Sequence, residues 1–176
     1  MDKVTTERIK YLHPKVRNEV SKAVEYINKK LLGKGVRLRI TWTHRTFKEQ
    51  DELYAQGRTK PGKKVTNARA GFSFHNYGLA FDIVIILDKD GDGNFTEVCW
   101  STVADNDYDG KADWMEVVAH FKSIGWKWGG DFKKLVDSPH FEKTFNHTET
   151  QLLNKYNADD DFAEVIDGKT YNWVNL

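Results

Sequence analysis

The segment from Leu79 to Leu87 is apolar at every position except Asp82. A short, continuous apolar run of this kind is typical of a β-strand that is buried on both faces. A carboxylate without a partner is costly in such a strand, because a buried charge needs a counter-ion or a metal. The run therefore predicts a central strand and a bound partner for Asp82.

Two histidines are candidates for that partner. His75 precedes Asp82 by an odd number of residues, so an unbroken strand would place the two side chains on opposite faces. Gly78 lies between them and allows the chain to bend. With His140 from a later segment, we predict that His75, Asp82 and His140 bind one Zn²⁺ and leave a fourth position for water. The alternative is two histidines satisfied within the protein and a salt-bridged aspartate.

A second carboxylate accompanies the later histidine. Asp137 and His140 are separated by Ser138 and Pro139. Pro139 favours an extended Ser138 and a turn, which lets Asp137 and His140 converge. Asp137 is then free to accept a proton from a water at the metal.

These residues form three motifs: Ser-x-His-x-x-Gly-x-Ala-x-Asp at 73–82, Trp-Gly-Gly-Asp-Phe at 128–132 and Asp-x-Pro-His-Phe-Glu at 137–142. Over roughly residues 35–150 the chain resembles the M15 zinc peptidases. That family includes D-Ala-D-Ala carboxypeptidases, vancomycin-resistance D,D-dipeptidases and the L-alanyl-D-glutamate endopeptidases of bacilli and phage endolysins. Asp rather than Glu at position 137, and the Trp-Gly-Gly segment, are more similar to the L-alanyl-D-glutamate branch.

The resemblance implies an α+β fold with a small central antiparallel sheet, helices packed on one side and a zinc site in a cleft on the sheet, as in the Hedgehog signalling domain. It assigns the metal to His75, Asp82 and His140, the catalytic carboxylate to Asp137, and a contact with the substrate carbonyl oxygen to Arg45. The implied function is a zinc metallopeptidase that cleaves the peptidoglycan stem peptide at the L-Ala–D-Glu bond. A D,D-carboxypeptidase and a non-catalytic, metal-bound binding module are the alternatives.

The pattern around Arg45 supports such a cleft. Val36 to Trp42 alternates as a half-exposed strand, and Thr46 with Glu49 forms a capping box for a helix to about Gln56. Arg45 therefore lies at a strand-to-helix junction, from which a long cation reaches a cleft; a surface arginine is the alternative. Three further residues are predicted to contact substrate or orient the site, with structural roles as their alternatives: Gln50, Ser73 and Trp128.

Residues 105–116 match the twelve-position calcium loop. The side-chain ligands fall at positions 1, 3, 5, 9 and 12, with a backbone carbonyl at 7 and the turn glycine Gly110 at 6. In order, the predicted ligands are Asp105, Asp107, Asp109, Lys111 (carbonyl), Asp113 and Glu116. No helix is predicted before the loop, so we expect Ca²⁺ on a strand-to-helix connection, with a regulatory or a structural role. The loop at 88–95 lacks an acid at its twelfth position and is interpreted as a hairpin turn.

Composition limits the other possibilities. An apolar content of 39% and a net charge of +1 indicate one folded domain over 1–176, with a core at about 14–156 and an extension at 157–176. The extension is predicted as a small strand or an added arm. Basic and aromatic residues are not interleaved as a nucleic-acid surface requires, and no apolar stretch is long enough to enter a membrane.

We expect a monomer that acts on the stem peptide. The N-terminus lacks the apolar core of a signal peptide. This predicts synthesis in the cytoplasm and action on the cell wall after release, as in phage lysis.

Overall fold

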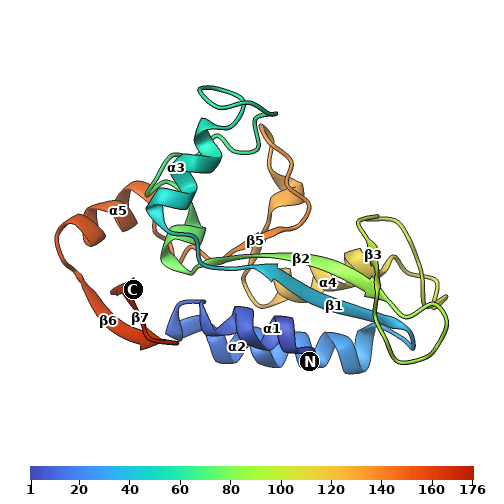
Figure 1. Cartoon of the computed structure of the whole chain (residues 1–176). Coiled ribbons are helices and arrows are strands. Elements are labelled where there is room, and N and C mark those ends of the chain that lie inside the picture. The colour runs from blue at the N-terminus through green and yellow to red at the C-terminus, as the bar shows by residue number, and fades with distance from the viewer.

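The computed structural model describes residues 1–176 and has an α+β fold built around one antiparallel sheet (Figure 1). The strand order is β1-β2-β5-β4, and β3 also pairs with β2. The strands are β1 Val36–Trp42, β2 Ala80–Leu87, β3 Glu97–Cys99, β4 Lys127–Trp128 and β5 His140–Glu142. The apolar run singled out in the sequence is β2, and it is the central strand: β1 pairs with one edge, while β5 and β3 pair with two parts of the other.

The chain has five α-helices. They are α1 Lys3–Lys10, α2 Pro14–Tyr26, α3 Phe47–Ala55, α4 Asp113–Ser123 and α5 Glu149–Asn157; α2 continues into the π-helical turn η1 Ile27–Leu31. In Figure 1, α1 and α2 run along one side of the β1–β2 pair, and α3 and α5 lie at one end of it. None of the helices combines the length and the apolarity that crossing a bilayer requires.

The alternation of side chains along β2 separates the core from the site. Phe81 packs against Phe121 of α4 and Phe141 of β5, with ring centroids 4.9 and 5.4 Å apart. Asp82 is the next residue, so its side chain points to the opposite face of the sheet. In the β2–β5 register His140 is directly opposite Asp82. The pairing that brings Phe81 onto Phe141 thus also places Asp82 beside His140.

Several expected elements are confirmed. Strand β1 has the predicted bounds, and the capping box of Thr46 and Glu49 starts α3 with both of its reciprocal hydrogen bonds. The predicted bend occurs at Gly78, which has φ +66° after the 3₁₀ turn η2 (Phe74–Tyr77). A Cβ at this position would lie 2.6 Å from the backbone nitrogen of His13, so glycine is required for packing as well as for conformation.

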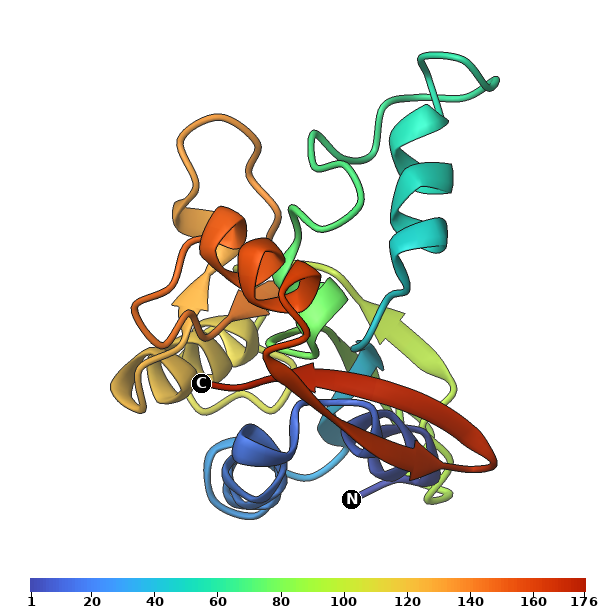
Figure 2. The same cartoon turned by 90° about the vertical axis from the view of Figure 1, so that its left-hand side faces the viewer.

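The predicted extension at 157–176 contains a β-hairpin at 161–174. Strands β6 Asp161–Ile166 and β7 Lys169–Val174 pair through the turn at Asp167 and Gly168. Figure 2 shows the hairpin lying beside α1 and α2. Trp173 and Val174 are fully buried, and Val174 joins the hydrophobic core of 27 side chains that extends from Ile9. The hairpin is therefore packed onto the rest of the protein.

Candidate metal centre

The three predicted zinc ligands converge. His75 Nε2 lies 3.1 Å from His140 Nδ1, and Asp82 Oδ1 lies 3.3 Å from each of these nitrogens. Tetrahedral Zn²⁺ with bonds of about 2.0–2.1 Å requires ligand atoms separated by about 3.3 Å. The triangle formed by the three atoms has that size, so the residues fit a zinc ion with one position left open.

The remaining nitrogen of each imidazole has a partner that fixes its proton. His75 Nδ1 is 2.6 Å from the carbonyl oxygen of Thr43, and His140 Nε2 is 3.2 Å from Glu142 Oε2. Both partners are acceptors, so they hold the ring protons on His75 Nδ1 and His140 Nε2. When both rings are neutral, the unprotonated nitrogens face one another and Asp82. Outer hydrogen bonds of this kind orient metal-binding histidines.

The local charges favour an added cation. Burial disfavours a charged His140, but hydrogen bonds to Asp82 and Glu142 outweigh this and raise the pKa of His140 to about 9. Burial also disfavours the charged form of Asp82, which by itself would raise its pKa. The neighbouring charges of His75 and His140 nevertheless hold that pKa well below its usual range. In the absence of a metal, a proton is the positive charge that this field attracts.

Asp137 lies in the same cleft, which has a volume of about 640 Å³ and is also lined by the three ligands. Burial, followed by the charge of Asp82, raises the pKa of the Asp137 carboxyl. Its backbone accepts a hydrogen bond from His140 N at 3.1 Å, which closes the predicted turn around Pro139. A carboxylate with a raised pKa that no other side chain binds is suited to accept a proton.

The neighbouring glycine allows this turn to lie close to the metal site. Asp137 N donates to the carbonyl oxygen of Gly129 at 3.0 Å, within the 3₁₀ turn η3 (Gly129–Asp131). A Cβ at Gly129 would lie 2.3 Å from Asp137 O and 3.0 Å from His140 Cβ. Glycine is required here because the two backbone segments are in direct contact.

Trp128 was predicted to contact substrate. The structure places it outside the lining of the cleft. Its indole Nε1 donates to the carbonyl oxygen of Ser138 at 2.7 Å, and its ring lies against Gly130. The residue supports the turn that carries Asp137 and His140. A half-buried aromatic ring with one polar tip suits this role, because the tip can bind backbone while the ring packs.

Arg45 lines the cleft, as predicted. Its backbone N donates to the carbonyl oxygen of His75, and its Nη1 donates to Gln50 Oε1 at 3.0 Å. Burial lowers the pKa of the guanidinium, while the charges of Asp82 and Asp137 act in the opposite direction. The guanidinium is therefore held near both carboxylates, with its Nε buried and without a partner.

The remaining predicted contacts divide into two kinds. Ser73 lines the cleft, but Gln50 is fully buried and does not. Its amide nitrogen donates to the carbonyl oxygen of Ala68 at 2.7 Å, while its oxygen accepts from Arg45. Gln50 thus orients Arg45 and links α3 to the segment at 66–68, and has no surface to offer a substrate.

Two residues with a part in the site were given no role from the sequence, Thr43 and Glu142, while Gly129 was noted only as part of the Trp-Gly-Gly motif. Glu142 ends the Asp-x-Pro-His-Phe-Glu motif, and its position two residues after His140 on one strand face was a usable signal. Thr43 acts through its backbone carbonyl, which has no sequence signature.

The calcium loop is only partly assembled. Carboxylate oxygens of Asp105, Asp107 and Asp109 lie within 4.8 Å of one another. Asp113 does not join them: it is buried at the start of α4, and its Oδ2 accepts from Asn106 Nδ2 at 2.6 Å. Its role as a side-chain calcium ligand stays a prediction.

The other two predicted calcium residues lie beside this group. Lys111 Nζ is 3.2 Å from Asp109 and 3.4 Å from Glu116 Oε1. The Glu116 side chain is only 8% exposed, and its Oε2 is buried without a partner. The earlier loop also brings three carboxylates together, those of Asp88, Asp90 and Asp92.

Comparisons with known proteins agree with this geometry. Residues 66–143 match the family model described as D-alanyl-D-alanine carboxypeptidase (Peptidase_M15_4). Among solved structures, the fold is similar to that of a Serratia marcescens L-Ala D-Glu endopeptidase, ChiX, with a TM-score of 0.53 and 19% identity over 82% of this chain and 90% of that one. This likeness supports the fold.

The relationship in sequence is stronger. The chain is 45% identical over 131 residues to the peptidoglycan L-alanyl-D-glutamate endopeptidase CwlK of Bacillus subtilis, which covers 74% of this chain and 72% of that protein. The segment that matches the family model, residues 66–143, includes the three converging ligands and Asp137. This chain therefore belongs to the M15 family of zinc peptidases.

Proposed function

We propose that the protein hydrolyses the bond between L-alanine and D-glutamate in the stem peptide of peptidoglycan. The observation that carries the proposal is the convergence of His75, Asp82 and His140 beside Asp137 and Arg45 in one cleft. The 45% identity to CwlK, named for this reaction, supports the choice of bond. The family model named for D-alanyl-D-alanine carboxypeptidases keeps that activity as the second candidate.

His75, Asp82 and His140 are the residues that would hold Zn²⁺. When bound, zinc supplies a Lewis acid that polarises a carbonyl group and lowers the pKa of a water molecule. Asp137 would accept the proton of the attacking water and transfer it to the leaving amine. The Arg45 guanidinium would donate to the carbonyl oxygen as negative charge develops there. Gln50 holds that guanidinium in place through its 3.0 Å hydrogen bond.

Digestion of purified muropeptides followed by mass spectrometry tests the proposal. The expected products are a muramyl-L-alanine fragment and a peptide that begins with D-glutamate. Release of terminal D-alanine would identify a D,D-carboxypeptidase instead. No new termini with zinc-loaded protein would indicate a non-catalytic binding module.

We also infer that residues 105–116 bind Ca²⁺. Support comes from the three clustered carboxylates and from Glu116, whose Oε2 is buried and unpartnered at the twelfth position. Burial, and then the charge of Asp109, raise the pKa of Glu116, although Lys111 opposes the shift. Asp107 also accepts a hydrogen bond from Gly33 N at 2.6 Å, which links the loop to the end of η1.

Calcium in this loop would order the connection between the central strand and α4 and so affect the cleft. The expected result is higher peptidase activity in millimolar Ca²⁺ than in a calcium-selective chelator, with zinc content unchanged. Equal activity in the two conditions would leave a structural role only. Calorimetry should detect Ca²⁺ binding to the wild type and weaker binding to Glu116→Gln. No binding to the wild type would contradict the inference.

The remaining expectations are proposals of the same kind. The one hydrophobic core supports a single domain over 1–176. We expect the protein to act as a monomer. We also expect it to reach the cell wall after release, in a phage-derived lysis. Comparison of the protein's mass in solution with 20.4 kDa tests the oligomeric state.

A further inference from the structure

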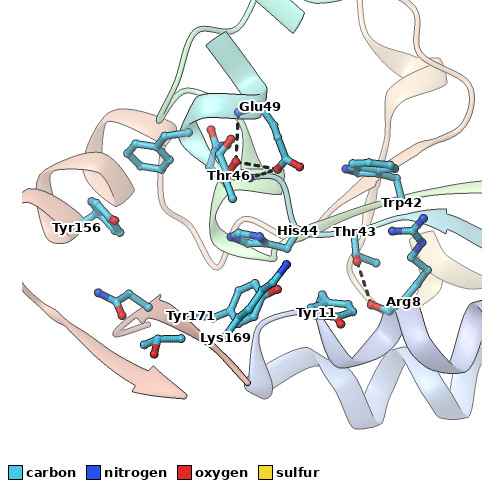
Figure 3. A pocket seen from close by; sticks show the side chains of 14 residues that line it. Arg8, Tyr11, Trp42, Thr43, His44, Thr46, Glu49, Tyr156, Lys169 and Tyr171 are labelled. Carbon is cyan, nitrogen blue, oxygen red and sulfur yellow. Dashed lines mark hydrogen bonds between the residues drawn. The ribbon is translucent and has the colours of Figure 1, made fainter. Parts of the chain in front are cut away.

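A second pocket lies next to the metal cleft and shares no lining residue with it. Its volume is about 700 Å³, and it is enclosed by α1, the end of β1, the start of α3, α5 and strand β7 of the C-terminal hairpin. Figure 3 shows the side chains that point into it. The proposed hydrolysis assigns no role to this pocket.

Its lining combines aromatic rings with unpaired cations. Tyr11, Trp42 and Tyr171 line the pocket together with Arg8 and Lys169. The Arg8 guanidinium lies 4.9 Å from the centroid of the Trp42 ring, and neither it nor Lys169 Nζ forms an ion pair or a side-chain hydrogen bond. The pocket thus offers flat apolar faces and free donors at the same time.

The histidine in this lining adds no charge near neutral pH. Burial lowers the pKa of His44 to about 4, so the ring is uncharged. Glu49 is engaged with Thr46 in the capping box of α3. Burial would raise the pKa of Glu49, but these hydrogen bonds lower it, so Glu49 stays a carboxylate. The two cations, from α1 and from the hairpin, outnumber it and leave the pocket with a positive balance of charge.

One side chain connects the pocket to the cleft. The Trp42 ring centroid lies 4.9 Å from Arg8 Cζ on the pocket side and 5.9 Å from Arg45 Cζ on the cleft side. Along the backbone, His44 faces the pocket and the next residue, Arg45, faces the cleft. The two cavities therefore lie on either side of this part of the chain.

We propose that this pocket binds the N-acetylated amino sugar to which the stem peptide is attached. The inference rests on the proposed function. In peptidoglycan, L-alanine is joined to the lactyl group of N-acetylmuramic acid, so the sugar begins one residue before the L-Ala–D-Glu bond. One extended residue spans only about 3.5 Å. An enzyme that holds this bond at the metal cleft must therefore accommodate the sugar close beside it.

The chemistry of the pocket fits a saccharide. Aromatic rings such as those of Tyr11 and Tyr171 suit the C–H faces of a sugar ring, while cationic and amide donors bind its hydroxyl and N-acetyl oxygens. Arg8, Lys169 and Asn172 supply such donors. The hairpin thus gains a role in binding the glycan end of the substrate.

The test compares two substrates in the zinc-loaded, full-length protein. One is a muramyl peptide that carries the sugar, and the other is the same stem peptide with a free L-alanine. The variant Arg8→Ala/Lys169→Ala removes both free cations without removing a hydrogen bond of the fold. Lys3→Ala/Lys34→Ala is the matched control, because it removes the same charge from exposed positions outside the pocket.

For the pocket variant, KM for the muramyl peptide is expected to rise about tenfold, as for the loss of one or two hydrogen bonds to a ligand. Values for the free peptide, and both values for the control, are expected to stay unchanged. An equal change on both substrates, or no change on either, would overturn the inference while leaving the proposed hydrolysis intact.

Direct binding gives an independent result. The disaccharide of N-acetylglucosamine and N-acetylmuramic acid, without peptide, is added to ¹⁵N-labelled protein. Chemical-shift changes at the Trp42 indole and the Asn172 amide support the pocket, and their absence at millimolar sugar overturns it. Failure of the wild-type enzyme to cleave either substrate would instead refute the proposed function, and the disaccharide result would still decide the sugar site.

Discussion

Individual atoms explain why the site favours a cation. His75 and His140 use opposite ring nitrogens for the metal, because Thr43 O fixes the proton of one ring and Glu142 that of the other. With Asp82, this leaves three acceptors and no donor around one point. Without a metal, a proton on His140 fills this place, as its raised pKa indicates.

The first prediction concerns the carboxylate that binds no other side chain. Asp137→Asn is expected to retain zinc and to lower kcat by about a hundredfold to ten-thousandfold, the usual contribution of a general base. Zinc content by atomic absorption and muropeptide turnover are measured on the same preparation. Loss of the metal in this variant would make Asp137 a ligand and contradict its role as base.

The second prediction concerns the carboxylate behind His140. Glu142→Ala removes the acceptor of His140 Nε2, and affinity for zinc is expected to fall by about 10–100-fold, as for other outer partners of metal-bound histidines. Competition with a chromogenic chelator measures the affinity. Glu149→Ala is the control, since this residue lines the same cleft and bonds no ligand. Equal losses in the two variants would argue against the proposed role of Glu142.

The sequence predicts the residues that carry the chemistry of the site better than it predicts the contacts that hold them in place. The ligands and Asp137 could be proposed because an isolated carboxylate in an apolar strand, and histidines near a glycine and a proline, limit the possible partners. The contact of Gly129 with the Asp137 carbonyl oxygen could not, since it joins two backbones that meet only in the folded state. The contact of Trp128 with this turn could not be foreseen for the same reason, because a half-buried indole fits a cleft wall and a turn support equally well.

At the scale of elements, apolar patterns and capping residues were sufficient to predict several segments. β1, β2 and α3 follow their patterns, whereas α1 was not predicted because only Thr5 and Ile9 of that helix are buried. Its N-cap, Asp2, was a usable signal. The hairpin also had one: Asp167-Gly168 is a common two-residue turn, and it adopts φ values of +50° and +78°.

The third prediction concerns how this hairpin is attached. Arg17 of α2 binds both carboxylate oxygens of Glu164 and lies over the Trp173 ring at 5.5 Å. Lysine cannot form the paired hydrogen bonds or stack in the same way. Arg17→Lys is expected to lower the free energy of unfolding by about 1 kcal/mol, discounted for partial exposure. A double-mutant cycle with Glu164→Gln, followed by urea unfolding, should give a coupling of similar size; additive effects would contradict the proposed attachment.

At the scale of the whole molecule, one buried histidine links stability to pH. His13 Nδ1 accepts from Lys15 N, its Nε2 is 3.0 Å from Val174 O, and its ring lies edge-on to Trp173. Burial lowers its pKa; among the charged groups around it, Lys15 and Arg17 act in the same direction and Glu164 opposes them. The native state therefore keeps His13 neutral at pH values where the unfolded chain already binds a proton.

The fourth prediction follows from the sign of this difference. Its contribution to stability is complete above the unfolded pKa of about 6.5 and is lost as the pH falls towards the native pKa, by up to about 1.4 kcal/mol per pH unit. Urea unfolding of the wild type from pH 7.5 to 5 is compared with that of His13→Asn, which cannot titrate. A wild-type slope no steeper than that of the variant would contradict the assignment.

The short pairing of β5 with β2 has a consequence for how long the enzyme survives where it works. Strand β5 contributes three residues to the sheet, and its His140 lies 58 positions from Asp82. An ion shared by the two side chains would act as a staple across that long excursion of the chain. A chelator should therefore expose the 129–143 segment to proteases well before the remainder unfolds, so that retention of the ion sets the working lifetime of the enzyme as well as its catalysis.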